Sequence, residues 1–278
     1  MSSLEFTSIG NTFGTRVRGV QPHLLQAHPE ATEKLRQRLR HEGVLVLSGM
    51  DIGANDFVDL LGLFGQVRPA RVKHASLPLP ASDYVFVGQR TADTPQKLTR
   101  GDVAHVWHVD YSTSGPIPQY SAQYTVKADP GGGTLGFADM RQVHAALPEH
   151  TKTQIQNLWA IHYEHPVGVD VEPPGQAAAL SWDERHQGTA HPLVMHDSAG
   201  RPFLCLPARP DSPIQGWSER TSAELLDFLW SHLEPHGSGW EYEPQAGDIV
   251  IWDNRALAHK RAEWPLNKER LAWFITTN

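Results

Sequence analysis

Two short stretches, far apart in the chain, carry side chains of the kind that bind metal ions. The first is Trp-His-Val-Asp at 107–110, and the second is Trp-Asp-Asn-Arg at 252–255, which is followed by His259. Together, His108, Asp110 and His259 supply two imidazoles and one carboxylate. This set is typical of mononuclear non-heme Fe(II) sites, in which three protein ligands hold one face of the metal and leave the other positions open.

The local sequence predicts how these ligands meet. The stretch 104–111 is expected to form a short strand and turn. Residues i and i+2 of a strand face the same side, so His108 and Asp110 can bind one ion. His259 follows a strand-like run at 248–252 and a turn-prone pair of residues. The three ligands converge if the two strands are neighbours.

Three open positions on Fe(II) are enough for a bidentate 2-oxoacid and dioxygen. Such a co-substrate carries a second carboxylate, which requires a cation. Arg270 lies after His259 in another strand-like run, 269–277. Because a guanidinium suits planar, bidentate binding of a carboxylate, Arg270 is the expected partner of this second carboxylate.

These stretches make the chain similar to a known family, the taurine dioxygenase / 2,4-dichlorophenoxyacetate dioxygenase group of Fe(II)- and 2-oxoglutarate-dependent oxygenases. The resemblance covers most of the chain and includes Gly-Gly-Gly-Thr-Leu-Gly-Phe-Ala-Asp-Met-Arg at 131–141, which is closer to the aryloxyacetate branch, and His-Pro-Leu-Val at 191–194. It implies iron ligands at His108, Asp110 and His259, partners of the distal carboxylate of 2-oxoglutarate at Thr134 and Arg270, and a wall residue beside the iron ligands at Trp252.

The same resemblance implies a reaction. 2-Oxoglutarate and dioxygen would be co-substrates, succinate and CO2 would be released, and a C–H bond of a small organic molecule would be hydroxylated, with desaturation or cleavage as alternatives. Taurine-type members carry an additional arginine four residues after the co-substrate arginine, where this chain has Phe274. Taurine is therefore disfavoured as the substrate. Asp110 disfavours halogenation, because related halogenases have a small residue in its place.

The most basic stretch of an otherwise acidic chain is the cluster Arg68, Arg71, Lys73 and His74. A solvated loop would account for it. The functional alternative is that Arg71, Lys73 and His74 face an anionic group on the primary substrate. Phe274 is expected to line the same substrate pocket.

Two other groups of histidines have alternative interpretations. His162 and Glu164 form a His-x-Glu pattern that can also bind iron and competes with His108 and Asp110. No other motif residue surrounds it, so polar contacts near the active site, or ordinary surface positions, are favoured. His232 and His236 are spaced i and i+4 and can hold zinc. No third ligand is evident for them, and favourable interaction with a helix C-terminus is sufficient.

The run 131–136 matches the pattern G-x-G-x-x-G. A dinucleotide site with this pattern requires a strand, a tight turn and then a helix. Here Asp129-Pro130 precedes the glycines and a strand-like run, 134–138, follows them. These features favour a hairpin turn that delivers Thr134 to the site.

Hydrophobic periodicity predicts a mainly β chain with helices: a double-stranded β-helix, or jelly roll, with helical embellishments. Short strands are expected within 4–20, and the segment 166–190, rich in Pro, Gly and Ala, is expected to be a lid-like insertion. Helices are expected at 30–41, 55–64, 140–147 and 222–232, and strands at 44–47, 120–126 and 247–252.

Length and composition favour a single catalytic domain over 1–278 that acts on a small molecule. The net charge of −7 and the absence of like-charge blocks do not indicate a nucleic-acid partner. No membrane span or signal peptide is evident, and the lone Cys205 fits a reducing compartment, so a cytoplasmic location is expected.

Alternatives from other functional classes stay open on the sequence. One is a non-catalytic or zinc-bound small-molecule-binding module of the same fold, and another is a metal-dependent hydrolase. Association into a homo-oligomer is also open. Cys205 itself is expected to pack in the interior rather than to act as a reactive thiol.

Overall fold

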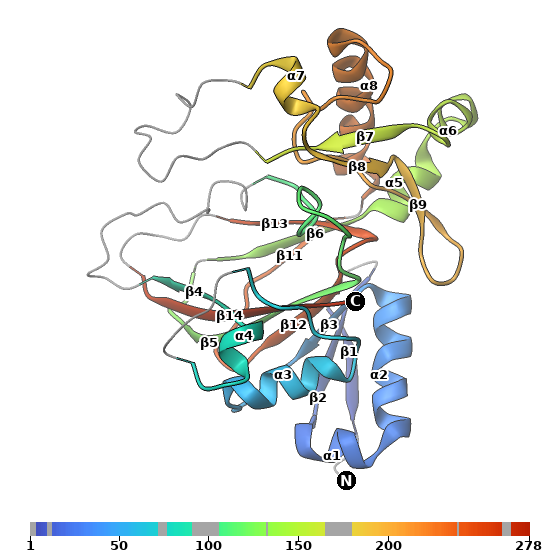
Figure 1. Cartoon of the computed structure of the whole chain (residues 1–278). Helices are drawn as coiled ribbons and strands as arrows, with labels where there is room; N and C mark the ends of the chain where they lie inside the picture. The colour runs from blue at the N-terminus through green and yellow to red at the C-terminus, as the bar shows by residue number, and fades with distance from the viewer. Residues whose placement is uncertain are drawn as a thin grey trace.

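The structure, a computed structural model, describes residues 4–9, 13–71, 77–90, 106–131, 133–164, 180–237, 239–262 and 268–278. Its largest element is a seven-stranded sheet (Figure 1). In spatial order its strands are β1 (Glu5–Ser8), β2 (Thr15–Arg18), β3 (Val44–Leu47), β12 (Ile249–Asp253), β5 (Tyr120–Ala128), β14 (Arg270–Thr277) and β4 (Phe86–Arg90).

A small sheet packs against this large sheet, and two further strand pairs lie beyond it (Figure 1). The small sheet consists of β11 (Trp240–Tyr242), β6 (Leu135–Asp139) and β13 (Leu257–Arg261), and the pairs are β7 (Trp159–His162) with β8 (Thr189–Pro192) and β9 (Val194–His196) with β10 (Pro202–Leu204). Two facing sheets with added helices confirm the predicted jelly-roll core.

The helices flank the two sheets on opposite sides (Figure 1). Beside the large sheet are α1 (Pro22–Ala27), α2 (Pro29–Glu42), α3 (Ala54–Gly62) and α4 (Ala81–Tyr84), and beyond the small sheet are α5 (Met140–Ala146), α6 (Glu149–Ile155), α7 (Trp182–Arg185), α8 (Glu219–Ser231) and α9 (Leu233–His236). None of the helices in the described part of the chain has the length and apolar character that crossing a bilayer requires.

The predicted helices are confirmed, with shifted ends that follow from their caps. Gly43 ends α2 in the left-handed conformation, with φ 76°, which costs a glycine little. The start of α8 lies before the predicted residue 222, because the Ser218 side chain accepts a hydrogen bond from the Thr221 backbone N–H. The capping residues therefore explain why these helix ends differ from those that hydrophobic periodicity alone predicts.

Strand alternation divides the interior into layers. On β12, Ile249 and Ile251 belong to a core between the large sheet and the helices beside it. This outer core also contains Leu35 from α2 and Phe57 from α3. The alternate residues of the same strand face the small sheet, because successive side chains of a strand point to opposite sides. That inter-sheet core contains Val44, Val46, Val250 and Trp252 from the large sheet and Leu135, Phe137, Tyr242 and Leu257 from the small sheet and its neighbours.

Two of the predicted segments are wrong in the described residues. Within 104–111, residues 106–110 contain one isolated bridge at His108 followed by a turn, not a strand. The glycine run at 131–133 is a crossover rather than a hairpin, since β5 pairs within the large sheet and β6 within the small one. The lid-like insertion at 166–190 stays a prediction, because 166–179 lies outside the described residues; its described part contains α7 and the start of β8.

A third core lies beyond the small sheet and contains Cys205, whose burial raises its thiol pKa to about 12. At the edge of this region His162 is 1% exposed and packs edge-on against His191, with 4.8 Å between ring centroids. Burial lowers the pKa of His162 to about 3. The imidazole of His162 is therefore neutral in the folded protein at neutral pH.

This burial predicts acid sensitivity. Between the ordinary pKa of 6.5 and the folded value of about 3, the unfolded chain binds a proton at His162 that the folded protein does not, so stability falls as the pH is lowered. Replacing His162 with phenylalanine should make the Tm of the metal-free protein less dependent on pH. Thermal unfolding followed by circular dichroism at about pH 7 and about pH 5 measures this; an equal drop in Tm in both proteins would contradict it.

Candidate metal centre

His108, Asp110 and His259 come together in the structure as the sequence predicts. Their ligand atoms all lie within 4.8 Å of one another. Among the described residues, these three form the one group of at least three His, Cys, Asp or Glu side chains that could hold a metal ion. Asp110 Oδ1 is 3.7 Å from His108 Nε2 and 3.4 Å from His259 Nε2. Two imidazole nitrogens and one carboxylate oxygen therefore surround a single point.

The two histidines meet through their backbones. His108 forms an isolated antiparallel bridge with His259 on β13, with N–H···O distances of 2.9 and 3.0 Å. Their rings lie 4.2 Å apart between centroids. The neighbour of the 106–110 stretch is thus β13 of the small sheet, not the predicted strand at 248–252, which is β12 of the large sheet. The turn at 253–256 carries the chain from one sheet to the other.

Hydrogen bonding and burial prepare the histidines to act as ligands. The Nδ1 of His108 lies 2.8 Å from the Val106 carbonyl oxygen, which favours the tautomer that leaves Nε2 with a free lone pair. Burial lowers the pKa of His108 to about 4. His259 is 6% exposed and lies beside the Trp252 ring, at 4.9 Å between centroids. Neutral imidazoles are the form that binds a metal.

Asp110 is fixed by two residues that the sequence reasoning missed. Ser121, on β5, donates to Asp110 Oδ2 at 2.7 Å, which leaves Oδ1 facing the histidines. The Asn254 side chain accepts from the Asp110 N–H at 2.9 Å and donates to its carbonyl at 3.2 Å. Burial would raise the pKa of Asp110, but the charge and hydrogen bond of His259 hold it below its ordinary value. The carboxylate is therefore ionised and oriented.

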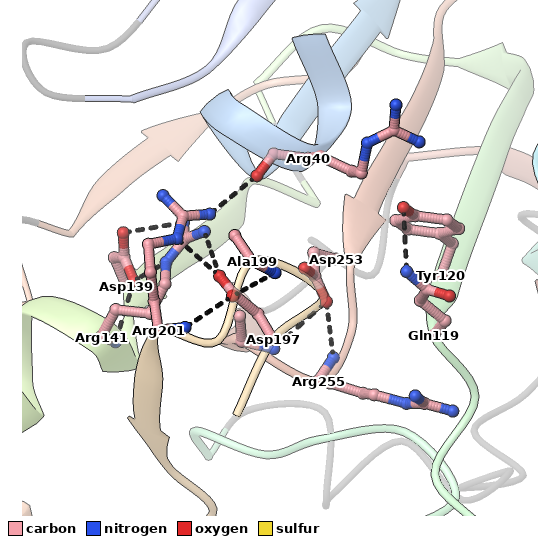
Figure 2. A network of polar contacts seen from close by, with 11 residues as sticks. Arg40, Gln119, Tyr120, Asp139, Arg141, Asp197, Ala199, Arg201, Asp253 and Arg255 are labelled. Atoms are coloured by element: carbon pink, nitrogen blue, oxygen red, sulfur yellow. Dashed lines mark hydrogen bonds and ion pairs between the residues drawn. The ribbon is translucent and has the colours of Figure 1, made fainter. Parts of the chain in front are cut away.

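A buried charge network supports the turn that carries Asn254 (Figure 2). Asp253 accepts from the N–H groups of Arg255 and Ala256, both at 3.2 Å. Burial raises the pKa of Asp253, while the charge of nearby Arg141 opposes the shift.

Arg141 is the centre of this network. Its Nε donates to Asp139 at 2.8 Å, and its Nη1 lies 3.7 Å from Asp197. Asp197 also accepts from Arg201 at 2.7 Å, and Arg201 donates to the Arg40 carbonyl at 2.9 Å. Figure 2 shows these side chains meeting beside Asp253. These contacts join the ends of α2, β6 and the β9–β10 turn, and the charge of Arg141 acts on Asp253 at the start of the 253–256 turn.

Arg270 points into the space between the sheets. It is 5% exposed, and its Nη2 donates to Gln123 Oε1 at 2.7 Å. Gln123 in turn donates to Thr125 on the same face of β5. Burial, together with the charge of Arg261, lowers the pKa of Arg270 to about 9. An anionic ligand would relieve the electrostatic cost of this buried cation.

Thr134 lies at the start of the small-sheet strand β6, which begins at Leu135. Its carbonyl accepts from Ala262 N–H at 2.8 Å, immediately before β6 begins. Arg270 pairs with Ala128 at the end of β5, and the 129–134 crossover joins these two points. The shared binding of one ligand by Thr134 and Arg270 stays a prediction.

Of the four predicted substrate residues, the structure describes Phe274 and Arg71. Phe274 packs against the Arg270 guanidinium, 5.6 Å from its Cζ, and against Phe86, 6.0 Å between centroids. Arg71 lies 3.8 Å from Glu164 and over the Tyr111 ring. Lys73 and His74 lie outside the described residues.

The competing metal patterns are not assembled in the described residues. His162 faces His191, while Glu164 pairs with Arg71, so these two do not form a ligand pair. His232 and His236 stack at 5.8 Å between centroids, but they are not part of a group of three potential ligands in the described part of the chain. The glycine run precedes strand β6 rather than a helix, which argues against a dinucleotide site.

Comparison with known proteins agrees with this geometry. Residues 5–276 match the model of the family described as taurine catabolism dioxygenase TauD, TfdA family. An alpha-ketoglutarate-dependent 2,4-dichlorophenoxyacetate dioxygenase of Burkholderia sp. (strain RASC) is 27% identical over 260 residues, which cover 87% of this chain and 84% of that protein.

Further similarities concern a second relative and the fold. An (S)-phenoxypropionate/alpha-ketoglutarate-dioxygenase of Delftia acidovorans is 27% identical over 98% of this chain and 94% of its own length. The crystal structure of AAD-2 in complex with Mn(II) and N-oxalylglycine superposes with a TM-score of 0.79 at 20% identity, covering 99% of this chain and 96% of that one.

Proposed function

The chain belongs to the taurine catabolism dioxygenase TauD, TfdA family, and we propose that it is an Fe(II)- and 2-oxoglutarate-dependent oxygenase that oxidises a C–H bond of a small organic molecule. One observation carries this proposal: two imidazoles and one carboxylate converge between the sheets, at His108, Asp110 and His259. This donor set suits Fe(II) and leaves coordination positions for ligands that are not protein.

Each group of residues has a distinct part in the mechanism. His108, Asp110 and His259 would hold Fe(II), which supplies the activation of dioxygen when it is bound. Arg270, oriented by Gln123, would bind the distal carboxylate of 2-oxoglutarate together with Thr134. Fixing the distal end of the co-substrate would orient it for oxidative decarboxylation, in which 2-oxoglutarate reacts with dioxygen to give succinate and CO2, with one oxygen atom entering succinate and the other the oxidised substrate.

The inter-sheet core limits the access of water to this site. Trp252 packs on the His259 ring, and Phe137 lies 6.5 Å from it between centroids. Both rings belong to the buried inter-sheet core. Apolar walls strengthen the electrostatic interactions within the site, because the local dielectric constant is low.

The substrate is proposed to be a small organic anion with an apolar or aromatic body. The Phe274 ring lies beside Arg270 and packs against Phe86, which is on β4, the edge strand of the large sheet. Aromatic rings favour an apolar partner, and no arginine stands at position 274 to bind a sulfonate. The names of two relatives, which act on 2,4-dichlorophenoxyacetate and (S)-phenoxypropionate, support the same substrate class.

A succinate-release assay tests this proposal. Purified protein is given Fe(II), 2-oxoglutarate and oxygen, and succinate is measured with aryloxyalkanoic acids, alkyl sulfates or taurine. We expect oxygen-dependent succinate formation that an aryloxyalkanoate stimulates and taurine does not. No succinate in any reaction would favour the zinc-bound binding module instead, and substrate turnover without oxygen would favour a metal-dependent hydrolase.

We further infer that the chain is one catalytic domain that works in the cytoplasm. The two sheets share one inter-sheet core, and the metal ligands come from both halves of the sequence. The buried thiol of Cys205 supports a reducing compartment.

A further inference from the structure

The residue that follows the metal ligand Asp110 has an unusual backbone conformation. Tyr111 has φ 62°. No other non-glycine residue in the described part of the chain has a positive φ. This region is disfavoured for residues with a Cβ, and for a bulky residue it indicates that surrounding contacts hold the backbone there. A strained residue next to a metal ligand suggests a link to the site.

The side chain of Tyr111 makes the contacts that can hold this conformation. Two cations lie over its ring: the Cζ of Arg68 is 5.2 Å and that of Arg71 is 4.6 Å from the ring centroid. Cations over an aromatic face attract it electrostatically. Burial raises the pKa of the Tyr111 phenol, and a hydrogen bond with Thr276 opposes this shift.

Both guanidinium groups are themselves anchored. Arg68 donates through Nη1 to the Pro116 carbonyl at 2.7 Å, and its backbone N–H donates to the Thr276 carbonyl at 2.9 Å. Arg71 pairs with Glu164, at the end of the described part of that segment, at 3.8 Å. The ring of Tyr111 is therefore held from fixed points on the 66–71 segment and on β14.

These contacts lead back to the carboxylate of Asp110. Thr276 on β14 pairs in register with Ser121 on β5, and Ser121 donates to Asp110 Oδ2 at 2.7 Å. The backbone of Asp110 is bound on both its N–H and its carbonyl by Asn254. Asp110 is thus fixed by its side chain and by its own backbone, and Tyr111 fixes the peptide that follows.

We propose that Tyr111 is a positioning residue for the metal centre: its ring, held by Arg68 and Arg71, keeps the backbone after Asp110 in the conformation that presents Oδ1 to the metal. The inference rests on the proposed metal site. It also gives Arg71 a different role from the predicted one, since its guanidinium lies over the Tyr111 ring and beside Glu164.

Metal binding tests this role without requiring turnover. Co(II), whose absorption spectrum reports ligand geometry, is titrated into metal-free wild type, Tyr111→Phe, Tyr111→Leu and Tyr111→Gly. Tyr111→Phe keeps the ring and should bind within about twofold of wild type, whereas Tyr111→Leu should weaken binding about tenfold, since loss of groups that orient metal ligands typically costs 10–100-fold. The Co(II) spectrum of Tyr111→Leu should change as well.

Tyr111→Gly separates positioning from simple strain. Glycine adopts φ 62° without a steric penalty, so this variant should unfold at a Tm no lower than that of Tyr111→Leu. It should nevertheless bind Co(II) about as weakly as Tyr111→Leu, because it lacks the ring. Wild-type affinity and spectrum in both variants would overturn the inference.

Two further proteins complete the test. Tyr242→Phe removes another buried phenol, which donates to Asp248 at 2.6 Å, and it should lower the Tm without altering the Co(II) spectrum. If Tyr111→Leu does not fold, Arg71→Met replaces it. This variant should weaken Co(II) binding about threefold, less than the 10–100-fold typical of groups that orient a ligand, because Arg68 still lies over the ring; unchanged binding would refute the role. Failure of wild type to bind Co(II) would instead remove the proposed function.

Discussion

Replacing His108 with alanine is expected to abolish succinate formation and to remove stoichiometric Fe(II) binding. Two ligands would remain, and the Nε2 atom that faces Asp110 Oδ1 at 3.7 Å would be lost. Turnover should fall by more than about 1,000-fold, because changes to residues that only orient a ligand already cost 10–100-fold. Bound iron is measured by metal analysis after desalting, and turnover by succinate release.

An exposed histidine provides the matched control. The His41 side chain is 79% exposed on α2, far along the chain from the metal ligands, so His41→Ala should bind iron and release succinate as wild type does. Thermal unfolding of the metal-free proteins shows whether both variants are folded. A folded His108→Ala protein that retains one equivalent of iron and wild-type turnover would show that the metal lies elsewhere.

The proposed metal ligands could be predicted from sequence because their residue types occur in or beside short motifs. His108 and Asp110 are two residues apart, and His259 follows a recognisable run at 252–255. Their route to one another could not be predicted in the same way. The expected strand at 104–111 and its expected neighbour were wrong, because the chain changes sheets at 253–256 and brings β13, not β12, to His108.

The residues that orient the site were missed because their roles depend on tertiary contacts. Ser121 and Gln123 are ordinary polar residues of a predicted strand, and only strand alternation in the folded protein turns them toward Asp110 and Arg270. Asn254 belongs to the stretch at 252–255, and its sequence context indicates only a turn. Its side chain binds a segment 144 residues away, which no local pattern reveals.

The basic cluster at 68–74 was open to two interpretations from sequence. A solvated loop would account for it, and the functional alternative was that Arg71, Lys73 and His74 face an anionic substrate, because a sequence reveals local charge but not the partners of that charge. In the structure Arg68 and Arg71 lie over the Tyr111 ring, and their partners come from Pro116 and Glu164. The prediction for Lys73 and His74 stays a prediction, since they are outside the described residues.

Replacing Arg270 with leucine is expected to raise the KM for 2-oxoglutarate by about 100-fold, since truncating one member of a buried charge pair costs about 2–5 kcal/mol. The co-substrate carboxylate would face Gln123, which cannot neutralise it. Arg270→Lys keeps a cation but loses the planar, two-point geometry, so its KM should lie between the two. Succinate release at varied 2-oxoglutarate concentration measures KM, and calorimetric titration of the Co(II)-loaded protein measures binding without turnover.

The specificity of this effect distinguishes a co-substrate anchor from a structural arginine. Arg220, whose side chain is 85% exposed on α8, is the control, and Arg220→Leu should leave KM unchanged. Because Arg270 is not among the metal ligands, Co(II) affinity should be the same in Arg270→Leu as in wild type, even though 2-oxoglutarate binding is weak. If 2-oxoglutarate bound normally to a folded Arg270→Leu protein, another cation would have to hold its distal carboxylate, and Arg261, whose charge lowers the pKa of Arg270, would be the next residue to replace.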